Sequence, residues 1–155
     1  MKNTVKISSA ELINADCLQY LPSLPDNSID LIVTDPPYFK VKPNGWDNQW
    51  KGDEDYLRWL DMCLAQFWRV LKPNGSLYLF SGHRLASDIE ILVRSRFNVL
   101  NHIIWAKPSG RWNGCNKESL RSYFPATERI LFAEHYQGPY QPKDDGYAEK
   151  SNDLK

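Results

Sequence analysis

An apolar run that two prolines stop abruptly is the feature of this sequence that most constrains its fold. The run Leu31-Ile32-Val33-Thr34 has the length and β-branching of a buried strand. Pro36 and Pro37 end the strand at once, because a proline has no N–H to donate to a sheet ladder. The tetrapeptide Asp35-Pro36-Pro37-Tyr38 therefore lies at the carboxyl end of a strand, where open α/β sheets bind their ligands.

The chemistry of this tetrapeptide suits a planar group that carries an amine. Asp35 and the neighbouring carbonyls can only accept hydrogen bonds, the prolines stiffen the loop, and Tyr38 offers a flat face. The exocyclic amine of a nucleobase, held by acceptors and stacked on a ring, fits this combination. The alternative is a purely structural turn, since proline pairs commonly end strands and Asp and Tyr are ordinary loop residues.

The rest of the chain alternates strands and helices. Apolar residues recur at helical spacing from Leu57 to Leu71, behind three acidic residues that suit a helix amino terminus. We expect strands at 12–14, 30–34, 76–81, 99–105 and 129–134, a short helix or turn at 18–24, and helices at 53–71 and 85–94. Helices between consecutive strands imply right-handed crossovers and a parallel sheet, while the segment before the last strand is too irregular to be a helix.

Several segments, in the same order, resemble the amino-DNA methyltransferases that use S-adenosylmethionine. The chain is most similar to the β-class adenine-N6 and cytosine-N4 enzymes, of a phage-like type and of the kind found in restriction–modification systems. The resemblance runs to about His135. The segments that carry it are Asn14-Ala15-Asp16-Cys17, Leu24 to Tyr38, Leu71 to Phe80, Trp105-Ala106-Lys107-Pro108 and Thr127 to Ala133.

The resemblance implies an α/β fold with a partial Rossmann-like methyltransferase sheet, mostly parallel, with an antiparallel hairpin at one edge. It also implies that residues 1–135 form the catalytic part and that residues 136–155 are a linker or the start of a target-recognition region. The family's Phe-x-Gly-x-Gly turn, which holds the methionine end of the cofactor, has no match among the eight isolated glycines. We therefore expect this chain to be the amino-terminal half of an enzyme and incomplete for activity by itself.

The resemblance also assigns roles to individual residues. The catalytic residues are Asp35, Pro36, Pro37 and Tyr38, and the cofactor-binding residues are Asp16, Cys17 and Asp35. Asp16 has a second interpretation as a turn cap.

The candidate nucleic-acid-binding residues lie in two loops and have structural alternatives. Phe39 is also typical of simple packing, and the tryptophans of the 39–52 loop either close over a flipped base or dock on the adjacent helix. The basic strip from Lys107 to Arg129 either faces phosphates or is an ordinary solvated loop. The assigned residues are Phe39, Trp46, Lys107, Arg111, Lys117 and Arg121.

Charge and cysteine content exclude some other classes. The formal net charge is zero, so only the local basic strip argues for a nucleic-acid partner. Cys17, Cys63 and Cys115 lack the spacing of a zinc site or a disulfide scaffold, and we expect no metal. No signal peptide or membrane-spanning run is visible, which predicts no membrane association and a cytoplasmic location in a bacterial or phage-infected cell.

Three functions stay open at this stage. The first is transfer of a methyl group from S-adenosylmethionine to N6 of an adenine flipped out of double-stranded DNA, and Asp35 favours adenine over cytosine. The second is the same reaction at cytosine N4. The third is a catalytically incomplete fragment that binds nucleic acid, and a homodimer is one open assembly state.

Overall fold

The structure is a computed structural model that describes residues 3–39, 49–108, 121, 123 and 126–135. Two short 3-10 turns, η1 (Leu21–Ser23) and η3 (His83–Leu85), accompany the longer elements. These elements are, in chain order, β1 (Asn3–Ile7), β2 (Ala10–Asn14), α1 (Cys17–Tyr20), β3 (Ile29–Thr34), α2 (Asp53–Val70), β4 (Leu71–Ser81), α3 (Ala86–Arg94), β5 (Phe97–Ala106) and β6 (Thr127–His135).

The main sheet has four strands in the order β3-β4-β6-β5. β3 pairs with β4 in parallel, whereas β6 is antiparallel to both of its neighbours. The expected hairpin at one edge is confirmed, whereas the expectation of a mostly parallel sheet is not confirmed because the sheet is mixed. β6 inserts between β4 and β5, so β3, β4 and β5 run in one direction and end at the same edge of the sheet.

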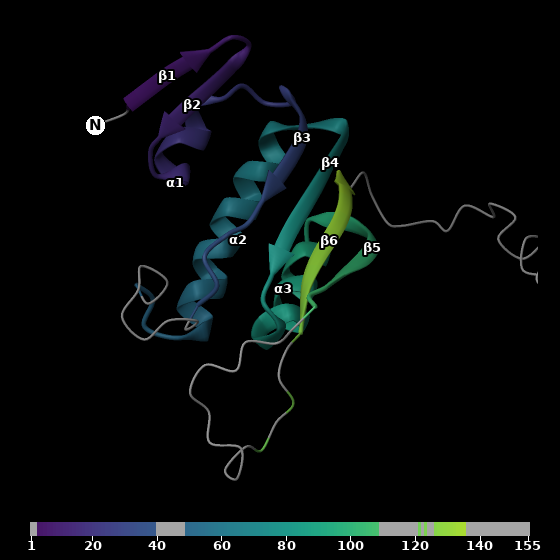
Figure 1. The fold of residues 1–155 in the computed structure, drawn as a ribbon. Helices are drawn as coiled ribbons and strands as arrows, with labels where there is room; N and C mark the ends of the chain where they lie inside the picture. The colour runs from purple at the N-terminus through teal and green to yellow at the C-terminus, as the bar shows by residue number, and fades with distance from the viewer. Residues whose placement is uncertain (1–2, 40–48, 109–120, 122, 124–125, 136–155) are drawn as a thin grey trace, which may run out of the picture.

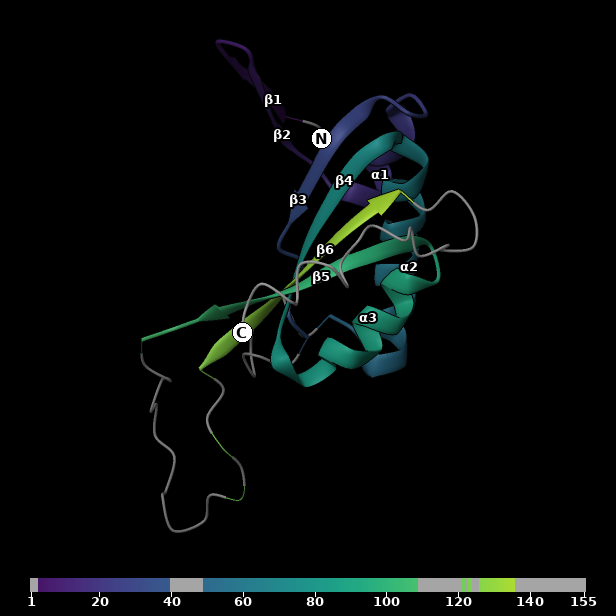
Figure 2. The ribbon, with the colours of Figure 1, turned by 90° about the vertical axis from the view of Figure 1, so that its right-hand side faces the viewer.

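Both long helices cover the same face of this sheet (Figures 1 and 2). Leu60 and Leu64 of α2 pack in one core with Leu77 and Leu79 of β4 and Leu131 of β6. The helical spacing and the acidic first turn correctly predicted α2, because one apolar stripe faces this core.

The opposite face of the sheet leaves apolar side chains of β3 in contact with solvent. Leu31 is 53% exposed and Val33 is 62% exposed, while Ile32 packs against the core. The prediction of a buried strand is therefore only half right, because β3 lies at the edge of a sheet that the described helices cover on one side.

An amino-terminal hairpin precedes the main sheet. β1 and β2 pair with each other in an antiparallel register in which Ile7 lies opposite Ala10. Sequence analysis placed only a short strand at 12–14 and missed β1. The two-residue turn, Ser8-Ser9, lacks the glycine or asparagine that is typical of such hairpins, although Ser8 adopts a positive φ of 54°.

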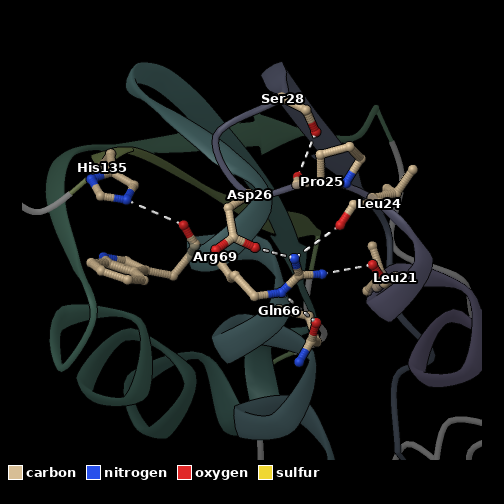
Figure 3. A network of polar contacts seen from close by, with 9 residues as sticks. Leu21, Leu24, Pro25, Asp26, Ser28, Gln66, Arg69 and His135 are labelled. Carbon is tan, nitrogen blue, oxygen red and sulfur yellow. Dashed lines mark hydrogen bonds and ion pairs between the residues drawn. The ribbon is translucent and has the colours of Figure 1, made fainter.

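A half-buried arginine connects the segment before β3 to α2 (Figure 3). The Arg69 guanidinium donates to the carbonyls of Leu21 at 2.8 Å and Leu24 at 2.9 Å, and it also binds the Asp26 carboxylate. These bonds hold the segment that leads into β3 against α2.

The described residues contain neither a candidate membrane span nor a candidate metal site. None of the described helices combines the length and apolar character needed to cross a membrane. Within the same residues, no three His, Cys, Asp or Glu side chains are placed to hold a metal ion.

Candidate active site

A cavity of about 410 Å³ lies at the edge of the sheet where β4 and β5 end and β6 begins. The tetrapeptide reaches it from the end of β3, and η3, α2 and α3 supply the remaining wall. The lining residues are Tyr38, Phe39, Tyr56, Gly82, His83, Arg84, Leu85, Ile89, Lys107, Thr127 and Glu128.

The ring of Tyr38 lies against the backbone where β4 ends. A Cβ atom at Gly82 would be 3.2 Å from Tyr38 Cδ2 and 3.5 Å from Tyr38 Cγ. Gly82 has an ordinary φ of −72°, so the backbone conformation would accept any residue. The glycine leaves room for the aromatic ring, which would have to shift by a few tenths of an ångström to accommodate a Cβ atom.

Charged groups from the ends of β5 and β6 meet the tyrosine hydroxyl. The Lys107 ammonium forms an ion pair with one Glu128 oxygen and lies 4.8 Å from the centre of the Trp105 ring. The Tyr38 hydroxyl donates to the other Glu128 oxygen at 3.5 Å. Glu128 thus joins Lys107 and Tyr38, and its charge is largely balanced by the lysine.

The same surroundings keep the tyrosine neutral. Burial raises the pKa of Tyr38 above its ordinary value, and the carboxylates of Asp35 and Glu128 raise it further. The ring at the cavity wall therefore has a protonated hydroxyl throughout the range in which proteins work, and it can act as a neutral stacking surface.

Comparison with known proteins identifies the family. The N6/N4 methyltransferase family model, described as DNA methylase, matches residues 29–154. The chain belongs to the N6/N4 DNA methylase family. The match covers most of the chain and includes the strand, the tetrapeptide and the cavity.

Individual relatives agree with this family assignment. Type II methyltransferase M.HpaI of Haemophilus parainfluenzae is 40% identical over 127 residues, which cover 80% of this chain and 38% of the relative. DNA adenine methyltransferase YhdJ of Escherichia coli is 34% identical over 99 residues, or 63% of this chain and 33% of the relative. This methylase chain spans 22% to 50% of the length of the curated relatives that it matches.

Solved structures also match most of the chain. TTHA0409 of Thermus thermophilus, described as a DNA modification methylase and complexed with S-adenosyl-L-methionine, has a TM-score of 0.59 and 27% identity. The match covers 86% of this chain and 59% of the Thermus protein. The cytosine-N4-specific PvuII DNA methyltransferase has a TM-score of 0.58, and the match covers 77% of this chain and 47% of the PvuII chain. At 22% identity this likeness shows the shared fold alone.

The predicted catalytic residues lie together at the end of β3, but they differ in their relation to the cavity. Tyr38 lines the cavity, whereas Asp35 is exposed and is not among the lining residues. Pro36 and Pro37 are half-buried between them. Asp35 is nevertheless close enough to Tyr38 to influence the pKa of its hydroxyl.

The aromatic residues after the tetrapeptide pack into the core. Phe39 is 4% exposed and stacks on Tyr56 with ring centroids 5.9 Å apart. Trp50 contacts Tyr56 and Trp59 of α2, each at 4.9 Å, so the alternative of docking on the helix is confirmed for this tryptophan. A nucleic-acid role for Phe39 stays a prediction.

The residues assigned to the cofactor lie at the start of α1. Asp16 is the helix N-cap, and its Oδ1 accepts from the backbone N–H of Leu18 at 2.8 Å. The capping alternative therefore describes Asp16 in this structure, and its exposed carboxylate leaves the cofactor role as a prediction. Cys17 faces Cys63 of α2.

Of the predicted basic residues that the structure describes, one lines the cavity and one does not. Lys107 lines the cavity but is paired with Glu128. Arg121 is exposed and is not among the lining residues. The remaining nucleic-acid predictions, Trp46, Arg111 and Lys117, lie outside the described residues.

Of the eleven residues that line the cavity, sequence reasoning assigned only Tyr38, Phe39 and Lys107 to the site, and three of the others make specific contacts there. Gly82 and Glu128 contact Tyr38, and Arg84 pairs with Asp53 at 2.6 Å while its guanidinium carbon lies 5.9 Å from the centre of the Phe39 ring. The sequence offered one indication of a role for Glu128, because it is one of only two acidic residues in the basic strip from Lys107 to Arg129. Gly82 follows a predicted strand but belongs to no glycine motif, so nothing local indicated its contact.

Proposed function

We propose that this chain supplies the target-base half of a DNA methyltransferase that modifies the exocyclic N6 of adenine in double-stranded DNA. The observation that supports this proposal is the position of the tetrapeptide, which places the Asp35 carboxylate at the end of β3 and the neutral Tyr38 ring in the cavity wall. The finer choice of adenine rests on the aspartate at the first position.

The reaction needs hydrogen-bond acceptors beside the target amine. The lone pair of adenine N6 is delocalised into the ring, so attack on a methyl group builds positive charge on that nitrogen. The Asp35 carboxylate and the Pro36 carbonyl stabilise this charge when they accept the amine hydrogens, which is preorganised electrostatic catalysis. The carboxylate need not remove a proton before the attack.

The target base reaches these acceptors only outside the double helix. Extruding it costs a few kcal/mol, and stacking in the pocket offsets part of that cost. A cavity of about 410 Å³ is within the usual range for small-molecule sites, and Tyr38 offers its ring as the stacking surface. Glu128 positions this ring by accepting from its hydroxyl, and Lys107 balances the carboxylate.

The cofactor of the family is S-adenosylmethionine, which supplies the methyl group when bound. The exposed carboxylates of Asp16 and Asp35 can accept hydrogen bonds from the amine and hydroxyl groups of its adenosyl part. This donor set fits that end of the cofactor. The residues assigned to the cofactor offer no corresponding cradle for the methionine end.

Analysis of DNA nucleosides tests the proposal. The protein, as its gene encodes it, is incubated with unmodified double-stranded DNA and a methyl-labelled cofactor, and the digested DNA is examined by mass spectrometry. We expect labelled N6-methyladenine with the unaltered protein and with Asp30→Ala, an exposed β3 carboxylate that pairs with Lys72. Asp35→Ala should form almost none.

The other outcomes separate the alternatives. Labelled N4-methylcytosine would show that the target is cytosine, which has an exocyclic amine of the same kind. The PvuII enzyme, which shares the fold, is cytosine-N4-specific. No labelled base, combined with no calorimetric signal for the cofactor, would support a non-catalytic nucleic-acid-binding fragment instead.

A further inference from the structure

Two cysteines that are distant in the sequence meet between α1 and α2. Cys17 and Cys63 are 46 positions apart, yet their Sγ atoms are separated by only 3.7 Å. Both are free thiols. A sulfur–sulfur bond is about 2.05 Å long, so a modest approach of the short helix α1 to α2 would bring the two atoms into bonding range.

The two thiols have different surroundings. Cys63 is 2% exposed and belongs to the buried side of α2, whereas Cys17 is half-buried and reachable from solvent. A hydrogen bond from the Cys63 thiol lowers the pKa of Cys17 to about 7, although burial and the neighbouring Asp16 carboxylate act in the opposite direction. The same hydrogen bond, together with burial, raises the pKa of Cys63.

This arrangement supplies an attacking and a resolving thiol. A reactive cysteine is one that is partly exposed and present as a thiolate near neutral pH, and a second thiol within reach captures its oxidised form. Cys17 has the first set of properties, and Cys63 is placed for the second role. The sequence alone showed neither, because the two residues have no paired spacing.

We propose that Cys17 and Cys63 form a reversible oxidation site, at which hydrogen peroxide converts the two thiols into a disulfide that fastens α1 to α2. The Cys17 thiolate attacks one peroxide oxygen, the O–O bond breaks, and a sulfenic acid and hydroxide form. The Cys63 sulfur then attacks the Cys17 sulfur, which expels its oxygen as hydroxide, and the released protons convert both hydroxides to water. Two thiols lose two electrons in total, and one peroxide is reduced to two waters.

The cross-link would close a loop that contains part of the site described above. The loop between the two cysteines contains β3 and the tetrapeptide Asp35-Pro36-Pro37-Tyr38. A disulfide that closes a loop of this length restricts the unfolded chain, so oxidation should raise the Tm by roughly 5 °C or more. Reduction should reverse this shift.

Peptide mapping tests the oxidation site. The full chain, fully reduced, is titrated with hydrogen peroxide, alkylated to block the remaining thiols and digested without reductant. We expect a peptide that joins Cys17 to Cys63 and lacks two hydrogens, together with a Tm increase that dithiothreitol removes. Cys115→Ser is the matched control and should form the same cross-linked peptide.

Two variants show whether the cross-link needs both partners. Cys17→Ser and Cys63→Ser should each abolish the linked peptide and the Tm increase. Because Cys63 is in the core, Cys63→Ala serves as a second variant if serine lowers the Tm of the reduced protein. A cross-link through Cys115, a disulfide between two chains, or a sulfenic acid on Cys17 that persists beside a free Cys63 would overturn the proposal.

Discussion

Gly82 makes room for the Tyr38 ring, since a methyl group on its α-carbon would lie 3.2 Å from Tyr38 Cδ2. The contact joins the end of β4 to the tetrapeptide that follows β3, two adjacent parallel strands of the sheet. Gly82→Ala should therefore move the ring by a few tenths of an ångström and weaken stacking of an extruded base, by less than the roughly 1–3 kcal/mol that complete loss of such a ring costs. A 2-aminopurine at the target position should fluoresce less with this variant.

The control for this experiment is Gly52→Ala. No atom lies within 4 Å of the position that a methyl group would take at Gly52, so the ring and the fluorescence should be unaffected. Equal fluorescence for Gly82→Ala and the unaltered protein would mean that the position of the Tyr38 ring does not matter for base flipping.

Two substitutions separate the ring of Tyr38 from its hydroxyl. Tyr38→Phe should keep most of the turnover, because the ring supplies the stacking energy of about 1–3 kcal/mol. Tyr38→Ala should lose both turnover and the 2-aminopurine signal. If phenylalanine is as damaging as alanine in single-turnover assays, the hydrogen bond to Glu128 is the functional feature and stacking is not.

Asp35 should act on the reaction and not on DNA binding. Asp35→Ala removes an acceptor that is needed as charge develops, so turnover of the active protein should fall by roughly two to three orders of magnitude, the scale of losing an oxyanion-hole contact. Asp35→Asn keeps the shape and one acceptor and should be intermediate. Single-turnover rates and DNA affinity are the measurements, and an unchanged rate for the alanine variant would remove Asp35 from the mechanism.

Arg69 should stabilise the fold more than an exposed arginine does. Its guanidinium donates to the carbonyls of Leu21 and Leu24 before β3 (Figure 3), so Arg69→Ala removes both hydrogen bonds and should cost about 1–3 kcal/mol in the free energy of unfolding. Arg94→Ala removes an exposed pair with Glu90 within α3 and should cost about 0.5 kcal/mol or less. Urea denaturation measures both, and equal losses would contradict the structural role of Arg69.

The reactivity of Cys17 should depend on pH in the way its thiolate does. The thiolate is the nucleophile, so alkylation by iodoacetamide should accelerate as the pH rises through about 7, the lowered pKa of Cys17. Cys63→Ala removes the hydrogen bond that lowers this pKa, and the midpoint should then move to higher pH. Mass spectrometry of the Cys17 peptide follows the rate, and an unchanged midpoint would show that the two thiols do not interact.

Local patterns were enough to locate several elements of the fold and one end of the site. The prolines after Leu31-Ile32-Val33-Thr34 mark where β3 stops, and the apolar stripe with its acidic first turn marks α2. These predictions held because backbone hydrogen bonding, proline geometry and helical periodicity act between residues close in the sequence. The tetrapeptide was found for the same reason.

Only the tertiary structure decided which distant residues meet. The sequence determined that a strand would precede Asp35. The insertion of β6 between β4 and β5 depends on strand pairing, which no local pattern encodes, and the expectation of a mostly parallel sheet was therefore not confirmed. That insertion places Glu128 between Lys107 and Tyr38, just as the packing of α1 on α2 brings Cys17 to Cys63. Such contacts result from how all the apolar faces are buried together, which is a property of the whole fold and not of any one segment.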